Sequence, residues 1–422
     1  MTLGFIILAG VLIGGLYMAW GIGANDVANA MGTSVGSGAL TLLGAIVLAG
    51  VLEFAGAVLI GSNVTQTISK GIIDTAMFDV DGPWGERGPI LLAVGMLCAL
   101  IAAAAWLHIA THYGLPVSTT HSIVGAVIGI GLVSFGLDGV DWGKLMQIMM
   151  SWVVSPVLGG LLAFLSFFAI RKFILNTPDP VAATIRTSPW IVGFVVMLLV
   201  LSFIYKVLGN RMDVPPVVMS FAVAGAAGAV SAVLASALTR NMVPAPGMSP
   251  YQFVERVFAL LQIGTACFVA FAHGANDVAN AIGPVAAVVS LSQAGFAAVP
   301  ATVGVPLWVL VLGGGGIVLG LATLGYKVIA TIGKEITEIT PTRGFSAEFG
   351  AAATVLLASS LGLPISTTHT LVGAVIGVGF ARGIGALNLR VIRNIVNSWL
   401  ATVPVAACAS ALLFFIARIF VG

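Results

Sequence analysis

Long apolar runs, separated by short polar breaks, make up most of this chain of 422 residues. A run of about 18 or more apolar residues is long enough to cross a bilayer as a helix, whose backbone satisfies its own hydrogen bonds. Two shorter apolar segments, residues 121–137 and 369–385, would each extend about 25 Å as helices, between a half-crossing and a full one. The long runs and the short segments together predict about twelve membrane segments. The long runs lie at residues 3–22, 38–62, 88–112, 143–175, 189–209, 214–239, 251–273, 306–332, 344–362 and 388–420.

The composition fits this pattern. Hydrophobic residues make up 59% of the chain and charged residues 8%, and the mean hydropathy is +1.12. A formal net charge of +2 gives no basis for a nucleic-acid partner. The three cysteines lie singly in apolar runs, so they predict neither a disulfide framework nor a metal site. We therefore expect an all-α, multi-pass protein of the cell membrane, in contact with the lipid bilayer and without a cofactor.

Two polar motifs interrupt the apolar sequence, and each occurs twice. The octapeptide Gly-Ala-Asn-Asp-Val-Ala-Asn-Ala stands at residues 23–30 and again at 274–281. The hexapeptide Pro-Val/Ile-Ser-Thr-Thr-His begins 93 residues after the start of the first octapeptide and 90 residues after the start of the second. From this hexapeptide onward, residues 116–131 and 364–379 are identical at 12 of 16 positions. Because both motifs return in the same order at similar spacing, they indicate an internal duplication.

The duplication divides the chain into a first membrane repeat, 1–175, a connecting segment with two transmembrane helices, 176–250, and a second membrane repeat, 251–422. A weaker match between residues 64–72 and 328–336 extends it. The positive-inside rule leaves parallel and inverted repeats open, because either arrangement places 11 Lys and Arg residues on one side and 6 on the other. Inverted repeats would bring both motif pairs together at mid-membrane, as in many transporters. We expect two inverted-topology repeats with broken helices or hairpins.

The hexapeptide has the pattern of a helix start. Proline ends the preceding helix, and serine and threonine are preferred N-caps for the apolar run that follows. At membrane depth, such a start presents free N–H groups and hydroxyls at the positive end of a helix dipole, which favours an anion. The alternative is ordinary capping between two packed helices. The candidate anion ligands are Ser118, Thr119, Thr120, Ser366, Thr367 and Thr368.

The octapeptide combines glycine, asparagine and aspartate in an apolar setting. Glycine permits an unwound backbone, and Asn25 and Asn29 share one face if the segment stays helical. Carboxylates within the membrane are costly and are usually functional, and oxygen ligands of this kind suit alkali or alkaline-earth cations. The alternative is a buried hydrogen-bond network between helices. The candidate cation ligands are Asp26, Asn29, Asp277 and Asn280, at expected breaks in their helices.

Two further acids, Glu53 and Glu348, lie in apolar runs and are not equivalent in the duplication. By local offsets, Glu53 aligns near Ile317 and Glu348 aligns near Leu100. Each is a candidate cation ligand or proton carrier, and the alternative is a carboxylate at the end of a helix.

Neither motif contains Arg or Lys, so an anion would be bound by hydroxyls, amides and helix N-termini. Carboxylates and an anion share a dry site only if cations or protons neutralise the carboxylates. This predicts cation-coupled anion transport rather than an enzyme. A passive anion channel and an intramembrane hydrolase with Ser118 or Ser366 as nucleophile are the alternatives, and nothing in the chain resembles a nucleophile elbow.

The paired motifs resemble the PiT family of inorganic phosphate transporters over nearly the whole chain. The resemblance implies a homodimeric symporter with both termini outside, which imports phosphate by alternating access. The coupling cation would be sodium, and proton-coupled phosphate symport, metal-phosphate symport and sulfate transport are alternatives within the same family.

The resemblance also implies roles for individual residues. Asp26 and Asp277 match the acids expected to hold the coupling cations, and Glu53 and Glu348 match two membrane glutamates considered essential for phosphate transport. The phosphate-binding positions correspond to Asn25, Asn276, Ser118, Thr119, Thr120, Ser366, Thr367 and Thr368.

Overall fold

The computed structural model describes residues 2–61, 71–205, 216–300, 303–360 and 365–421. Within these ranges the chain forms helices, turns and irregular segments, and no strand. This confirms the expected all-α fold. Nine of the described helices are long and apolar enough to cross a membrane, or ten if one bent pair counts as a single span. The total of twelve membrane segments stays a prediction.

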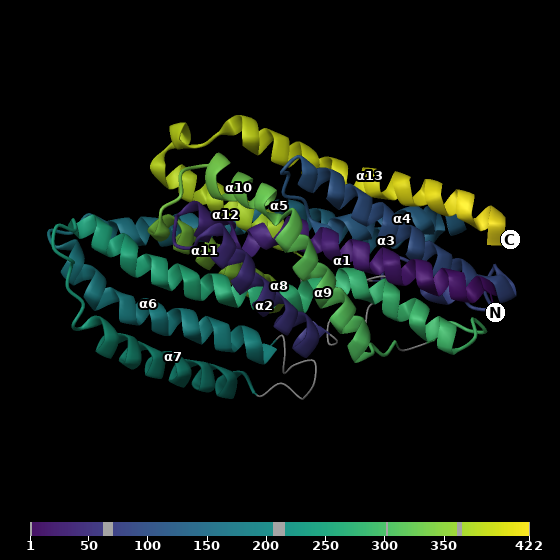
Figure 1. Ribbon diagram of the computed structural model, residues 1–422, viewed down its shortest axis with the longest axis horizontal. Helices are drawn as coiled ribbons and strands as arrows, with labels where there is room; N and C mark the ends of the chain where they lie inside the picture. Colours follow the sequence, from purple (N-terminus) through teal and green to yellow (C-terminus); the bar gives the residue numbers. More distant parts are fainter. Residues whose placement is uncertain (1, 62–70, 206–215, 301–302, 361–364, 422) are drawn as a thin grey trace.

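The helices form one elongated bundle (Figure 1), in which both chain termini lie at the same end. Helices α6 and α7 pack together along one flank, and α13 runs along the opposite edge. The helix bounds are α1 Thr2–Gly36, α2 Leu42–Ile60, α3 Gly88–His112, α4 Thr119–Phe135, α5 Trp142–Ile170, α6 Pro180–Phe203, α7 Val217–Thr239, α8 Pro250–Gln293, α9 Leu307–Thr323, α10 Gly325–Ala330, α11 Pro341–Ser360, α12 Thr367–Arg382 and α13 Leu389–Val421.

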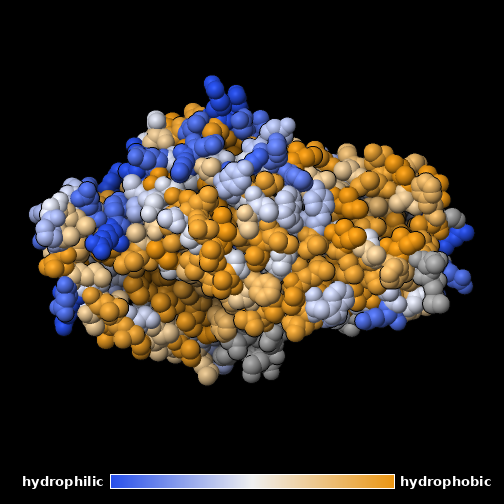
Figure 2. Space-filling view, viewed as in Figure 1, coloured by the Kyte–Doolittle hydropathy of each residue, from blue (hydrophilic) through white to orange (hydrophobic). Residues whose placement is uncertain are grey.

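The surface has the polarity expected of a protein in a bilayer. Figure 2 shows apolar residues over most of this face of the molecule, with hydrophilic residues gathered along its upper edge left of centre, at its left end and in small groups near its right end. Large apolar side chains such as Phe5, Val218 and Phe420 are more than two-thirds exposed. Such a surface is stable against lipid chains and would be unfavourable in water.

Helices from the two halves pack against each other in exchanged pairs. The octapeptide helices α1 and α8 contact each other, and each also contacts a helix of the opposite half, α9 for α1 and α2 for α8. In the same way α4 packs on α13, and α12 packs on α5. The weaker sequence match at residues 64–72 lies largely outside the described residues, and the inverted topology of the halves stays a prediction.

The expected helix breaks at the octapeptides do not occur. Helix α1 continues through the first copy for 35 residues, and α8 continues through the second for 44 residues. The glycines serve a different purpose, which is close helix crossing. A Cβ atom at Gly23 would lie 1.9 Å from the carbonyl oxygen of Ile317, and one at Gly274 would lie 2.1 Å from that of Glu53. Glycine therefore lets two backbones touch without unwinding either.

A broken span is found elsewhere, in the run expected as one helix over residues 306–332. Helices α9 and α10 meet at Leu324 with a bend of 60°. Both segments pack against α1, so the bend keeps this run in contact with the octapeptide helix on either side of the break. A π-helical turn, Thr331–Glu335, then ends the span.

Candidate functional site

Each hexapeptide caps a short helix, as the sequence predicts. Ser118 is the N-cap of α4, and its hydroxyl accepts a hydrogen bond of 3.2 Å from the backbone N–H of His121. Ser366 caps α12 in the same way, accepting a 3.2 Å bond from the N–H of His369. Both serines are buried. The two helix starts therefore place hydroxyls and a positive dipole end inside the bundle.

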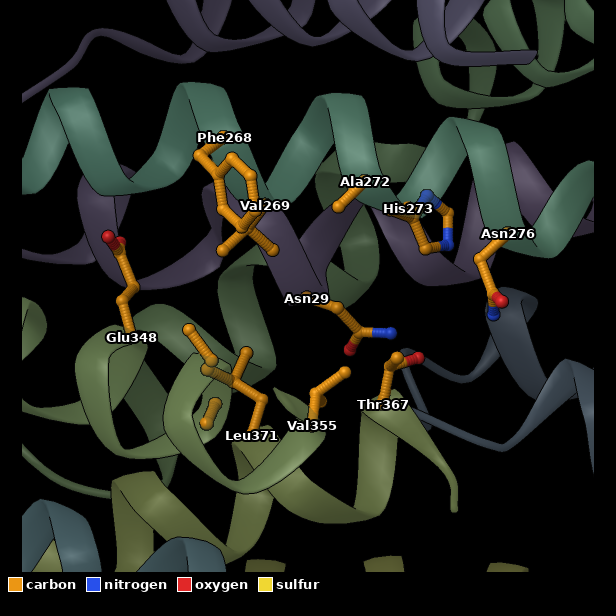
Figure 3. A pocket seen from close by; sticks show the side chains of 12 residues that line it. Asn29, Phe268, Val269, Ala272, His273, Asn276, Glu348, Val355, Thr367 and Leu371 are labelled. Atoms are coloured by element: carbon orange, nitrogen blue, oxygen red, sulfur yellow. The ribbon is translucent and has the colours of Figure 1, made fainter. Parts of the chain in front are cut away.

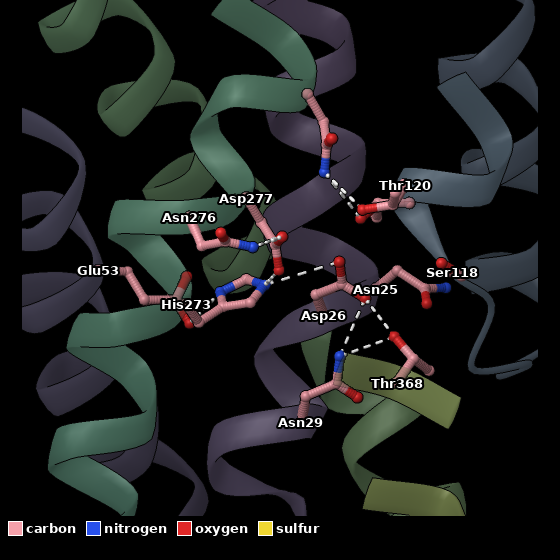
Figure 4. A network of polar contacts seen from close by, with 12 residues as sticks. Asn25, Asp26, Asn29, Glu53, Ser118, Thr120, His273, Asn276, Asp277 and Thr368 are labelled. Carbon is pink, nitrogen blue, oxygen red and sulfur yellow. Dashed lines mark hydrogen bonds and ion pairs between the residues drawn. The ribbon is translucent and has the colours of Figure 1, made fainter. Parts of the chain in front are cut away.

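Each octapeptide reaches the cap of the opposite half (Figure 4). Asn29 of the first half donates a 2.9 Å hydrogen bond to the hydroxyl of Thr368. Asn280 of the second half donates a 3.2 Å bond to the hydroxyl of Thr120 and lies 3.5 Å from that of Thr119. The candidate cation ligands and anion ligands are thus in direct contact at one place.

Three buried carboxylates surround one imidazole at this place. The Nε2 atom of His273 lies 2.9 Å from Oδ2 of Asp277 and 3.6 Å from Oδ2 of Asp26, and its Nδ1 atom lies 3.3 Å from Oε1 of Glu53. Each of the four side chains is at most 3% exposed. Asp26 also accepts 3.1 Å hydrogen bonds from Thr368 and from Asn29. The structure therefore brings Glu53 to the aspartates, although it lies on another helix.

Sequence reasoning missed His273. The signal is present, because the residue before the first octapeptide is Ile22 whereas the residue before the second is His273. His273 also stands four residues before Asp277, which places both on one face of a helix. A polar exception to an otherwise faithful repeat would have identified it.

The two asparagines predicted to bind phosphate have different surroundings. Asn25 donates to the hydroxyl of Thr111 at 2.9 Å and to the carbonyl of Leu115 at 3.0 Å, and it accepts from the N–H of Val117 at 3.0 Å. In this conformation its amide holds the segment that leads into α4. Asn276 donates a 2.8 Å bond to Oδ1 of Asp277 and faces a cavity.

This difference gives a prediction for Asn25. The substitution Asn25→Ala leaves the buried N–H of Val117 without its side-chain acceptor, so we expect a loss of about 1–3 kcal/mol of stability. Thr111→Val removes a single hydrogen bond and should cost less, about 1 kcal/mol. Thermal unfolding in detergent measures both. Equal unfolding temperatures for Asn25→Ala and the native protein would contradict this role.

Glu348 lies in a separate polar cage. Its Oε1 atom accepts hydrogen bonds from Thr33 at 2.6 Å, from Ser34 at 2.9 Å and from Gln262 at 3.2 Å. Its Oε2 atom accepts a further bond from Thr265. This glutamate therefore joins α11 to both octapeptide helices, and none of these donors is a residue that the sequence singled out.

A cavity of about 70 Å³ lies between the histidine cluster and this cage. A cavity needs about 10–15 Å³ to hold one water molecule, so this cavity has room for several waters or for a small ion. Figure 3 shows Thr367, Asn29 and Asn276 pointing into it from three helices. Its polar lining consists of Asn29, His273, Asn276, Glu348 and Thr367.

A sequence profile described as the phosphate transporter family matches residues 22–410. The chain belongs to this phosphate transporter family. A protein of Pyrococcus abyssi, provisionally named a phosphate permease, is 49% identical over 404 residues, which are 96% of each chain. An inorganic phosphate transporter of Arabidopsis thaliana chloroplasts is 47% identical over 94% of this chain and 70% of its own.

A solved structure of the family supports the fold. It is named "The sodium-dependent phosphate transporter", shares 46% sequence identity, and superposes with a TM-score of 0.86 over 98% of this chain and 99% of its own. This agreement identifies the chain as an integral membrane protein of the phosphate transporter family.

Proposed function

We propose that this protein is a secondary active symporter, and not an enzyme, that imports inorganic phosphate together with sodium by alternating access. The observation that carries the proposal is the pair of contacts Asn29–Thr368 and Asn280–Thr120, because they place each octapeptide against the helix cap of the other half. The similar solved structure is that of a transporter named as sodium-dependent, which supports sodium as the coupling ion.

The electrostatics of the site support coupling to cations. Asp26, Glu53 and Asp277 carry three negative charges when ionised, and His273 offsets at most one of them. An anion about 5 Å from one of these carboxylates would meet a repulsion of about 3 kcal/mol at an effective dielectric constant of about 20. Bound cations remove this repulsion and make the caps available to phosphate.

The candidate ligands have distinct parts in this mechanism. The carboxylates of Asp26 and Asp277, with Asn29, Asn280 and Glu53, would hold the cations. Asn276 and Thr367, which line the cavity, would contact phosphate first. Release of Thr368 from Asp26 when a cation binds would free its hydroxyl for the anion. The remaining proposed phosphate ligands are Asn25, Ser118, Thr119, Thr120 and Ser366, and Glu348 remains a proposed cation ligand.

Uptake into proteoliposomes tests the proposal. With an inward sodium gradient, we expect phosphate to accumulate above its external concentration, and we expect this accumulation to collapse when a sodium ionophore is added. Uptake driven only by a proton gradient, stimulated only by divalent metal, or specific for sulfate would replace the sodium–phosphate assignment with one of the alternatives of the same family. Equilibration without accumulation would show a passive anion channel.

The proposed setting is the cell membrane, where the chain would cross repeatedly and form a homodimer. Cross-linking of the purified protein in detergent measures the oligomeric state, and a single-chain product would contradict the dimer.

A further inference from the structure

The exception that His273 makes to the repeat changes the chemistry of the site. An imidazole nitrogen is a ligand that zinc, cobalt, nickel and iron accept readily, whereas sodium is bound by oxygen. The first copy of the repeat has Ile22 at the equivalent position. The duplicated oxygen ligands therefore acquire one nitrogen ligand, and only on one side of the site.

The geometry suits a single metal ion. Ligand atoms of Asp26, His273 and Asp277 all lie within 4.8 Å of one another. Two of the separations are 2.9 Å and 3.6 Å, both measured from Nε2 of the histidine. Atoms that share one ion at about 2.1 Å lie about 3–3.5 Å apart. Small side-chain shifts would therefore bring all three atoms onto one ion.

The surroundings are those of a metal-binding histidine. Such a histidine commonly directs its second ring nitrogen at a carboxylate, which fixes the tautomer and the ring orientation. Here Nδ1 of His273 lies 3.3 Å from Glu53, whose carboxylate accepts no hydrogen bond from the other described residues. The aspartates are oriented as well, Asp26 by Asn29 and Thr368.

One buried oxygen at this place needs a partner. Asp26 is fully buried. Its Oδ2 atom faces Nε2 of His273 and accepts no hydrogen bond from the described residues. A buried carboxylate oxygen without a hydrogen bond is unfavourable, and a cation on the same side would satisfy it.

We propose that Asp26, His273 and Asp277 form a binding site for one divalent transition-metal ion, which competes with the coupling cation for the two aspartates. Glu53 is the positioning residue behind the histidine. The competition rests on the proposed function, but metal ligation does not, so it can be measured without phosphate or sodium.

The experiment is a Co²⁺ titration of the purified full-length protein, treated with chelator and kept free of sodium and phosphate. We expect one equivalent of Co²⁺ per chain, with a visible ligand-field spectrum. The substitutions His273→Gln and Asp277→Asn should abolish stoichiometric binding. Glu53→Gln should weaken Co²⁺ affinity about 10- to 100-fold without abolishing it, as expected for a group that orients a ligand.

His112→Gln is the matched control, because His112 is exposed and its nearest partner is Lys327. It should bind Co²⁺ as the native protein does. No Co²⁺ binding by the native protein, or native binding by His273→Gln, would overturn the site. The spectrum reports coordination directly, and monodispersity on gel filtration shows that a variant which fails to bind is still folded.

Sodium is then added to the Co²⁺ complex. Release of Co²⁺ supports a shared pair of aspartates, and Co²⁺ that stays bound at saturating sodium overturns the competition. If Co²⁺ binds as expected but proteoliposomes take up no phosphate, the proposed function fails while the metal site stands.

Discussion

Replacing Asp277 with asparagine is expected to abolish sodium-stimulated phosphate uptake at ordinary sodium concentrations. The carboxylate and a sodium ion at about 2.5 Å attract by about 7 kcal/mol at an effective dielectric constant of about 20, before the cost of desolvation. If only about 2 kcal/mol of this remains as net affinity, its loss weakens sodium binding about 30-fold. The same change at Asp26 should have a similar effect, because both oxygens face His273.

The measurement is the sodium dependence of initial uptake rates in proteoliposomes. Asparagine is nearly isosteric with aspartate, so the fold should survive, and gel filtration of each variant checks this. Asp138→Asn is the control, because this exposed acid lies in the 3₁₀-helical turn Gly136–Gly139, which follows the end of α4 opposite to its cap. An unchanged sodium response in both Asp26→Asn and Asp277→Asn would refute the cation site.

Replacing Gly274 with alanine is expected to lower both stability and transport. The added Cβ would lie 2.1 Å from the carbonyl oxygen of Glu53, so α2 and α8 must separate. Overpacking of this kind costs about 1–3 kcal/mol. Because Glu53 itself forms the contact, the separation also moves its carboxylate away from His273, and uptake should fall by more than the loss of folded protein explains.

Two matched variants separate these effects. Gly264→Ala lies on the same helix with nothing within 4 Å of the new atom, so it should be neutral or slightly stabilising. Gly23→Ala has an equally severe clash, with the backbone of Ile317. The side chain of Ile317 is apolar, so this clash displaces no carboxylate. Unfolding temperatures in detergent and uptake rates are compared for all three variants. A native unfolding temperature for Gly274→Ala would contradict the close crossing.

Local sequence signals predicted the helices well where they were strong. The expected segment at residues 88–112 coincides with α3, since Pro89 marks its start and a turn with positive φ at Gly114 follows its end. The serine caps of α4 and α12 were predicted for the same reason. The predicted breaks at the octapeptides were wrong, because their polar side chains find partners on neighbouring helices, and the backbone has no need to unwind.

The site depended on contacts that no local pattern contains. The hydrogen-bond donors around Glu348 come from α1 and α8. Thr33 is 315 residues from Glu348 in the sequence, and Thr265 is 83 residues from it. The importance of His273 for the site follows from its contacts with Glu53 on α2 and Asp26 on α1. The sequence predicted that the two motif pairs would meet, but not that Glu53 and His273 would join the two aspartates.

The exchanged contacts have a consequence for how such a molecule could be assembled. The first cap is held from both halves, since Asn25 binds the backbone just before it and Asn280 reaches it from the second half. The second cap is reached from the first half by Asn29. A free half-length unit would carry every motif and still lack a complete pocket, until it met a second copy. Joining the two copies in one polypeptide replaces that encounter with a high effective concentration. It also lets one copy acquire a histidine that the other lacks, so that a paired site need not remain symmetrical.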